Sequence, residues 1–287
     1  MQRNPQPINP TIMKIAFCTC VQIGKSCIEA VISSGGRFDL LLTLHDHKSK
    51  KKSGRAYLDD IANDNWIPIY KLNHINDSDV AEVVKKYDID WLFIIGWSQI
   101  ASADFLKVPH KGVIGAHPTL LPTGRGRAAV PWAILKGLDK TGVTFFKMDE
   151  GVDTGEILDQ FEIPVSSDEI ATTLYNKVNE AHVELIQQIW PKLIEDKIIG
   201  VKQDESLASY WEGRTPEDGE LFHSMSLKEV DRLVRATTRP YPGAFIMIDK
   251  STKLTIWSGS TRPIQAAKVL NFIDGDYHVT DFEVLSI

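Results

Sequence analysis

Residues Gly112 to Gly155 read GVIGAHPTLLPTGRGRAAVPWAILKGLDKTGVTFFKMDEGVDTG, and this stretch decides the fold. Its first part, Gly112–His117, is a short apolar run that predicts a strand ending at a histidine. A second run, Gly142–Met148, predicts another strand, and an Asp153-Thr154-Gly155 turn follows it. His117 and Asp153 are 36 residues apart (153 − 117). An imidazole and a carboxylate at the ends of two strands can converge on one atom, which suits proton transfer and stabilisation of a developing charge.

Apolar runs and amphipathic stretches alternate on both sides of this segment. We expect strands at Lys14–Val21, Phe38–Leu44, Asp90–Gly96 and Ile157–Pro164, and helices at Gly24–Ser33, Ala56–Asn63, Asp77–Tyr87, Val130–Leu138 and Ser166–Trp190. This alternation predicts an α/β domain with a mostly parallel sheet. The end of the clearest strand, at Gly96-Trp97, is where such a sheet would expose a ligand crevice.

The pattern changes after about residue 200. Lys197–Arg214 has few periodic features and reads as a connector, and Glu217–Thr237 contains one amphipathic helix. Short strand-like pieces follow, at Ala244–Ile248, Leu254–Trp257, Ala266–Leu270 and Tyr277–Val284. We therefore expect a disordered leader at residues 1–12, an α/β domain at 13–200 and a small β-rich domain at 205–287.

Composition excludes several classes of protein. The formal net charge of −6 disfavours a general nucleic-acid binder, which needs a basic face for phosphates. No apolar run reaches the length that spans a bilayer, and the N-terminus has no secretory h-region. Cys18, Cys20 and Cys27 read as buried thiols without a second ligand pair, so no metal site is expected and a reducing cytoplasm fits. The absence of Gly-x-Gly-x-x-Gly after the first strand disfavours a dinucleotide cofactor.

Two features leave alternatives open. The basic stretch His47–Arg55 is either a solvated loop or a patch that receives substrate phosphates. His182 borders the apolar stripe of the helix expected at Ser166–Trp190, and we interpret it as structural or surface-exposed.

The motifs resemble those of the formyltransferases that use 10-formyltetrahydrofolate, a family that includes methionyl-tRNA formyltransferase and the N-formyltransferases of nucleotide-linked amino sugars. Matching motifs occur in order at His117, Thr119-Leu120-Leu121-Pro122, Arg125-Gly126, Thr141-Gly142-Val143-Thr144 and Asp153-Thr154-Gly155. Second-domain motifs match at Arg214–Gly219 and Arg239–Ala244, so the resemblance covers roughly residues 13–260. It implies a Rossmann-like formyltransferase domain followed by a small barrel-type domain, similar to an OB fold.

The resemblance also implies roles for individual residues. His117 and Asp153 would be catalytic, and 10-formyltetrahydrofolate would be the co-substrate. Folate contacts would come from Ile95, Gly96, Trp97, Met148, Asp149, Glu150 and Gly151, with Leu120, Leu121 and Pro122 as a wall for the pterin. The expected substrate contacts are Thr119, Arg125 and Arg127, although surface salt bridges are an equal alternative for the two arginines.

One position departs from the family pattern. The asparagine two residues before the histidine, which offers an amide to the oxyanion, is Gly115 here. Three interpretations remain open: another donor such as water or Thr119 substitutes, the acyl donor or acceptor differs, or the chain is a slow or non-catalytic folate- or nucleotide-binding member. Intact motifs around His117 and Asp153 favour the first.

The charge of the C-terminal region bears on the acceptor. Residues 201–287 carry 10 Lys/Arg and 13 Asp/Glu, a net charge of −3 (10 − 13), which disfavours the acceptor stem of tRNA. Arg125-Gly126-Arg127, the segment Phe145–Glu150 and the short second domain look most like the sugar branch of the family. We therefore expect an N-formyltransferase of a nucleotide-linked amino sugar that serves surface polysaccharide synthesis, with methionyl-tRNA formyltransferase as the alternative. A homodimer is an expectation from the family alone.

Overall fold

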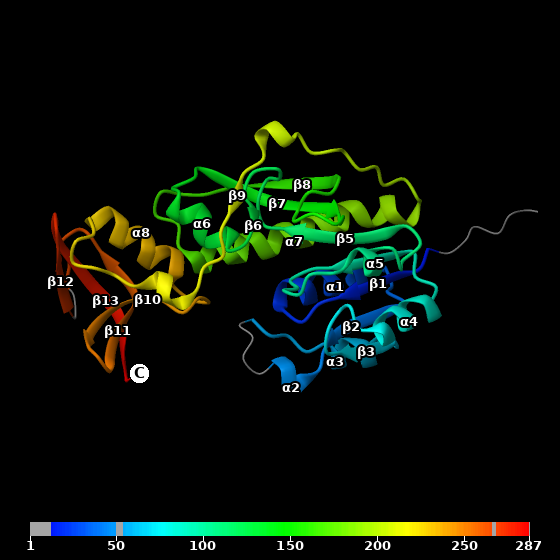
Figure 1. The fold of residues 1–287 in the computed structure, drawn as a ribbon, viewed down its shortest axis with the longest axis horizontal. Helices are drawn as coiled ribbons and strands as arrows, with labels where there is room; N and C mark the ends of the chain where they lie inside the picture. Colours follow the sequence, from blue (N-terminus) through cyan, green and yellow to red (C-terminus); the bar gives the residue numbers. More distant parts are fainter. Residues whose placement is uncertain (1–12, 50–53, 266–267, 287) are drawn as a thin grey trace, which may run out of the picture.

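The structure is a computed structural model that describes residues 13–49, 54–265 and 268–286. Figure 1 shows a large α/β part on one side and a small β-rich part on the other, joined by a long connecting segment. The expected leader at 1–12 and residues 50–53 of the basic stretch lie outside the described residues. In the part of the chain that the structure describes, no helix is long and apolar enough to cross a bilayer.

Seven strands form the central sheet, in the order β3-β2-β1-β4-β5-β7-β8. Their bounds are Ile15–Cys18 (β1), Leu40–Leu44 (β2), Ile69–Leu72 (β3), Trp91–Ile94 (β4), Gly112–His117 (β5), Lys140–Lys147 (β7) and Ile157–Pro164 (β8). β1 to β5 pair in parallel, while the β5–β7 and β7–β8 pairs are antiparallel. The expected mostly parallel sheet is confirmed, but the sequence analysis anticipated neither the antiparallel edge nor β3.

The strand order reverses beside β1, because the chain runs outward to β2 and β3 and then returns to β4 on the other side. At such a reversal the connections leave in opposite directions and open a crevice beyond the carboxyl ends of the strands. Gly96 follows β4 at this point with a φ of +66°, a left-handed conformation that favours glycine. The fold therefore places a ligand crevice beside Gly96-Trp97, where one was expected.

Successive strand residues point to opposite faces of the sheet, so each buried strand contributes to two apolar clusters. Ile15 and Phe17 of β1 join a cluster with α1 and α7, whereas Ala16 and Cys18 join a cluster with α4 and α5. The helices are Gln22–Ser33 (α1), Asp46–Ser49 (α2), Asp59–Asp64 (α3), Ser78–Lys86 (α4), Ala103–Leu106 (α5), Ala129–Leu135 (α6), Ala171–Ile194 (α7) and Leu227–Thr237 (α8). The three cysteines are buried free thiols, as expected.

The long helix α7 begins and ends later than the sequence pattern suggested. Ser166 and Glu169 have capping-box spacing, but their side chains bond each other before the helix, at 3.3 Å from Oγ to Oε2. The helix begins only at Ala171 and continues past Pro191 to Ile194.

The C-terminal part is a four-stranded antiparallel sheet in the order β10-β11-β13-β12, packed against α8. Its strands are Ala244–Asp249 (β10), Thr252–Ser260 (β11), Lys268–Phe272 (β12) and Gly275–Ser286 (β13). Between the two parts, the connector carries a 3₁₀ turn at Glu205–Leu207 (η1) and the short strand Tyr210–Trp211 (β9), which pairs with Arg125–Gly126 (β6). A second 3₁₀ turn, Pro216–Gly219 (η2), precedes α8.

Candidate active site

His117 is the last residue of β5, between β4 and β7 in the sheet. Its ring is almost fully buried, with 6% of the residue exposed. Nε2 lies 2.8 Å from the carbonyl oxygen of Gly124, and Nδ1 lies 3.4 Å from Oδ2 of Asp153. Both ring nitrogens therefore face oxygen acceptors.

Asp153 lies in the loop between β7 and β8, with a positive φ of 56°. Its Oδ2 accepts a hydrogen bond of 2.8 Å from the backbone N–H of Gly126. Within the described residues Oδ1 accepts no hydrogen bond, and 18% of the side chain is exposed. β7 runs antiparallel to β5, so the end of β7 does not lie beside His117. The loop after β7 turns back and brings the carboxylate of Asp153 to the ring.

The pair lines a cavity of about 540 Å³. Sites for small molecules commonly enclose about 300–1,000 Å³, so this volume suits an organic ligand. Three of the expected folate-contacting residues, Gly96, Trp97 and Met148, are in the lining. Apolar and hydroxyl-bearing side chains complete it, among them Ile94, Val130, Phe146, Tyr175 and Tyr241.

Gly115 also lines the cavity, and the space above its Cα is taken. A Cβ at this position would lie 2.9 Å from Cγ of Met148 and 3.1 Å from Cζ of Phe146. Contacts this short require Met148 to move. The thioether therefore occupies the place into which an asparagine side chain would extend.

The other expected folate contacts lie outside this cavity. Ile95 is fully buried and donates its N–H to the carbonyl of Cys18 at 3.1 Å. Asp149 and Glu150 line a neighbouring hollow of about 440 Å³ that shares Met148 with the cavity. Gly151 donates its N–H to Oδ1 of Asp149, which shapes the tip of the loop. Their folate contacts stay predictions.

The Leu120-Leu121-Pro122 turn packs away from the cavity lining. Leu121 is buried, and its N–H donates to Oγ1 of Thr144 at 3.1 Å. The Thr144 hydroxyl in turn donates to the carbonyl of Thr119 at 2.7 Å. Thr119 is 2% exposed and also lies outside the lining. This geometry favours a supporting role for the turn over direct contact with a pterin, and it gives no support to Thr119 as a substitute oxyanion donor.

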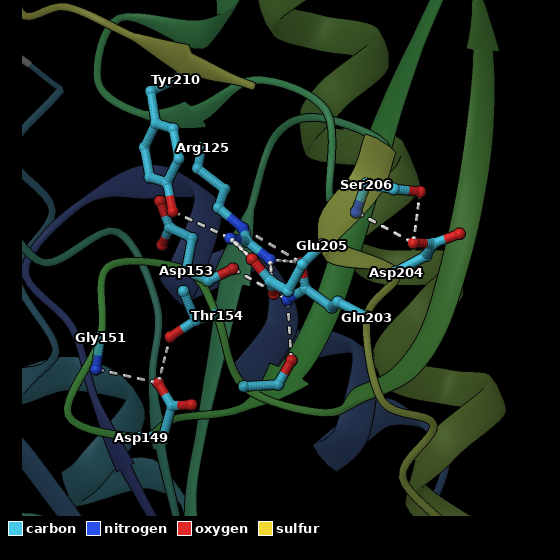
Figure 2. A network of polar contacts seen from close by, with 11 residues as sticks. Arg125, Asp149, Gly151, Asp153, Thr154, Gln203, Asp204, Glu205, Ser206 and Tyr210 are labelled. Carbon is cyan, nitrogen blue, oxygen red and sulfur yellow. Dashed lines mark hydrogen bonds and ion pairs between the residues drawn. The ribbon is translucent and has the colours of Figure 1, made fainter. Parts of the chain in front are cut away.

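Arg125 differs most from its expected role in binding substrate. Its side chain is 0% exposed, and its guanidinium makes five hydrogen bonds to Gln203, Glu205 and Tyr210 (Figure 2). A guanidinium has five N–H donors, so all are engaged within the protein. The adjacent carboxylate of Glu205 holds the pKa of Arg125 above its usual range. Arg127, by contrast, is exposed, and its expected substrate contact stays a prediction.

Sequence reasoning missed two tyrosines of the cavity. Tyr175 comes from α7 and Tyr241 from the segment between α8 and β10, so both parts of the chain contribute to the lining. Burial raises the pKa of both phenols, which therefore remain O–H donors at neutral pH. Tyr241 belongs to a motif that the resemblance had drawn on, whereas no local signal marks Tyr175.

Comparisons with known proteins concern the chain as a whole. The chain matches the family model described as formyl transferase over residues 13–189, and the model for the formyl transferase C-terminal domain over residues 214–276. Among similar solved structures is an N-formyltransferase from Helicobacter canadensis in complex with folinic acid and dTDP-3-aminofucose. It is 19% identical with a TM-score of 0.69, and the match covers 95% of this chain and 100% of that one.

Two further structures show the same fold. A sugar N-formyltransferase from Shewanella sp. FDAARGOS_354 is 19% identical with a TM-score of 0.69, covering 88% of this chain and 99% of that one. Methionyl-tRNA formyltransferase from Clostridium thermocellum is 19% identical with a TM-score of 0.65, covering 96% and 100%.

Proposed function

Because the chain belongs to the formyl transferase family, we propose that it transfers a formyl group from 10-formyltetrahydrofolate to the amino group of a nucleotide-linked amino sugar. The observation that carries the proposal is the His117–Asp153 pair, 3.4 Å apart, in the lining of a ligand-sized cavity. Acyl transfer to an amine needs an acceptor for the amine proton and donors for the negative charge that develops on the acyl oxygen. The carboxylate of Asp153 can accept the proton, whereas both nitrogens of His117 face acceptors in the protein, so the donors come from elsewhere in the lining.

The cavity fits a folate co-substrate in size and in chemistry. Trp97 and Met148 offer an aromatic and a polarisable surface for the co-substrate. When bound, the co-substrate supplies the formyl carbon that the amine attacks. As the bond to the amine nitrogen forms, the bond from that carbon to N10 breaks, and tetrahydrofolate leaves with the proton that the amine gives up. Among the described residues Oδ1 of Asp153 accepts no hydrogen bond and can take the amine proton, while Oδ2 accepts from Gly126 and faces His117.

The donor that the family asparagine would provide has to come from another group in the site. Thr119 is buried outside the cavity, and Met148 fills the space above Gly115. Tyr175 and Tyr241 line the cavity, and burial raises the pKa of both phenols further above neutral pH, so both hydroxyl groups are available as donors. We assign the missing oxyanion donor to this pair of tyrosines.

A sugar nucleotide is favoured over tRNA by charge. The excess of acidic residues in 201–287 opposes a polyanionic acceptor stem, whereas a diphosphate needs only a local cation. Arg127 is the exposed cation beside Gly126 and is our candidate for that contact. The product would enter a surface polysaccharide, the enzyme would work in the cytoplasm, and a homodimer is the expected assembly.

A single-turnover assay tests the proposal. The enzyme is mixed with 10-formyltetrahydrofolate and a panel of nucleotide-linked 3-amino and 4-amino sugars, with methionyl-tRNA in parallel, and the formylated product is detected by mass spectrometry. We expect product from at least one sugar, with His117→Ala and Asp153→Asn each lowering the rate about 10²–10⁴-fold.

The matched control is His223→Ala, which removes an exposed histidine of the C-terminal part that bonds the carbonyl of Asn271 and should keep the wild-type rate. Product from methionyl-tRNA alone would assign the chain to the tRNA branch. Folate binding without product from any amine would identify a non-catalytic binding protein.

A further inference from the structure

The loop that carries Asp153 has a conformation that needs support. A non-glycine residue at a φ of +56° costs on the order of 1 kcal/mol, so surrounding contacts must hold it in place. The side-chain amide of Gln203 supplies such contacts: Nε2 donates to the carbonyl of Asp153 at 2.8 Å and to that of Gly155 at 2.7 Å. One connector side chain thus binds the loop on both sides of Thr154 (Figure 2).

The orientation of that amide is itself fixed. Oε1 of Gln203 accepts hydrogen bonds from Nε and Nη2 of Arg125, at 3.2 and 2.8 Å. Because a guanidinium only donates, it selects the amide oxygen and turns the NH₂ group toward the loop. Glu205 binds the same guanidinium through both carboxylate oxygens, at 2.8 and 2.6 Å, and so limits its movement.

The same region also holds the groups that orient the catalytic side chains. The carbonyl of Gly124 faces Nε2 of His117, and the N–H of Gly126 donates to Oδ2 of Asp153. These two glycines flank Arg125, whose N–H donates to the carbonyl of Ser209 at 2.9 Å within the β6–β9 pairing. The connector therefore braces the backbone that orients His117 and the loop that presents Asp153.

We propose that Gln203, oriented by Arg125, is a positioning residue that holds Asp153 in contact with His117 for formyl transfer. The proposal rests on the function proposed above. Gln203 lies outside the residues that line the cavity, and Arg125 has no donor left for a ligand. Their effect on the reaction therefore passes through the loop.

The test replaces Gln203 without emptying the site. Gln203→Glu keeps the size and the pairing with Arg125, but it turns a carboxylate oxygen toward the carbonyls of Asp153 and Gly155, which repels them. Gln203→Met removes the polar contacts without adding charge. A small displacement of a reacting group costs about 10²-fold in rate, so we expect kcat to fall by that factor while KM for both substrates is unchanged. The control is Asp204→Asn, because that carboxylate bonds only Ser206 among the described residues.

A second readout does not depend on turnover. In histidine labelled with nitrogen-15, the NMR shift of Nδ1 of His117, assigned with His117→Ala, reports its contact with Asp153. We expect both Gln203 variants to change this shift and Asp204→Asn to leave it as in the wild type. If the wild-type enzyme shows no turnover but the His117 shift still changes in the Gln203 variants, the proposed function is wrong and the positioning role stands. Unchanged shift in both variants, whatever the rate, would overturn the positioning role.

Discussion

Two walls of the cavity are built in different ways. Backbone groups of Gly124 and Gly126 and a side chain of the connector hold the wall that carries His117 and Asp153. The second wall, around Gly115 two residues earlier on the same strand, is packed with Met148 and Phe146. The lining also includes Tyr175 and Tyr241, whose hydroxyl groups bond to no described residue. The first wall has its geometry set before a ligand arrives, whereas the second has side chains that can adapt. The difference teaches that proton transfer and the choice of oxyanion donor are separable in this chain.

Among the changes that test this comparison, replacing a tyrosine of the cavity should have the largest effect. If a tyrosine supplies the oxyanion donor, then Tyr241→Phe or Tyr175→Phe should lower kcat by about 10²–10³-fold, the usual cost of losing one such donor. KM should change little, because the stronger contact forms in the transition state. Steady-state kinetics with the sugar found in the panel would measure this.

Tyr57→Phe is the control for these variants, since Tyr57 is 50% exposed and lies outside the cavity. Wild-type kcat in both cavity variants would remove the tyrosines from the mechanism and leave water as the substitute donor.

A second prediction concerns how the free energy of unfolding depends on pH through His182. His182 on α7 is 3% exposed, with its ring centroid 5.8 Å from that of Phe145 and its Nδ1–H donating to the carbonyl of Val178. Burial lowers the pKa of His182 to about 4, and the neighbouring His117 shifts it in the same direction. In the unfolded chain His182 binds a proton below about pH 6.5, whereas in the folded chain it stays neutral down to about pH 4. The free energy of unfolding should therefore fall by about 3 kcal/mol across this window and be unaffected above it.

Urea unfolding of the wild type and of His182→Asn, at several pH values from 4 to 7, isolates this contribution. The asparagine amide can replace the bond to Val178 but does not titrate. Equal acid sensitivity of the two proteins would contradict the prediction.

The smallest expected effect sharpens the comparison at Gly115. Gly115→Asn should destabilise the protein by about 1–3 kcal/mol, because its Cβ would lie 2.9 Å from Cγ of Met148. Gly115→Asn with Met148→Ala should recover much of that loss and open room for the amide. Thermal unfolding compares the three proteins. A single variant as stable as the wild type would show that Met148 moves aside freely.

The main sheet could be predicted because its strands carry local signals. Gly112–His117 and Ile157–Pro164 have the predicted bounds, since each is a run of strand-forming residues ended by a proline or a turn. Ile69–Leu72 was not predicted, because it is a four-residue edge strand with only one buried residue. The antiparallel direction of β7 was also missed, since apolar periodicity is the same in both directions.

The chemistry of the site was only partly visible in the sequence. The motifs marked His117 and Asp153, and the structure brings these two together. Arg125 was predicted to bind an anionic substrate or to form a surface salt bridge. It is buried, and its contacts lie 78 to 85 positions away in the sequence, from Gln203 to Tyr210. Hydrogen bonds over such distances leave no periodic pattern. For the same reason the connector seemed featureless.

The two-residue pairing of β6 with β9 has a consequence for dividing this chain. The segment after α7 looks like a link between two separate domains. Its strand β9 nevertheless pairs with β6 and so belongs to the domain that precedes it. A chimera with a foreign C-terminal unit would therefore have to keep its crossover beyond Trp211. A splice near residue 200, where the sequence pattern changes, would remove Gln203 and β9. The loop that carries Asp153 would then lose these contacts.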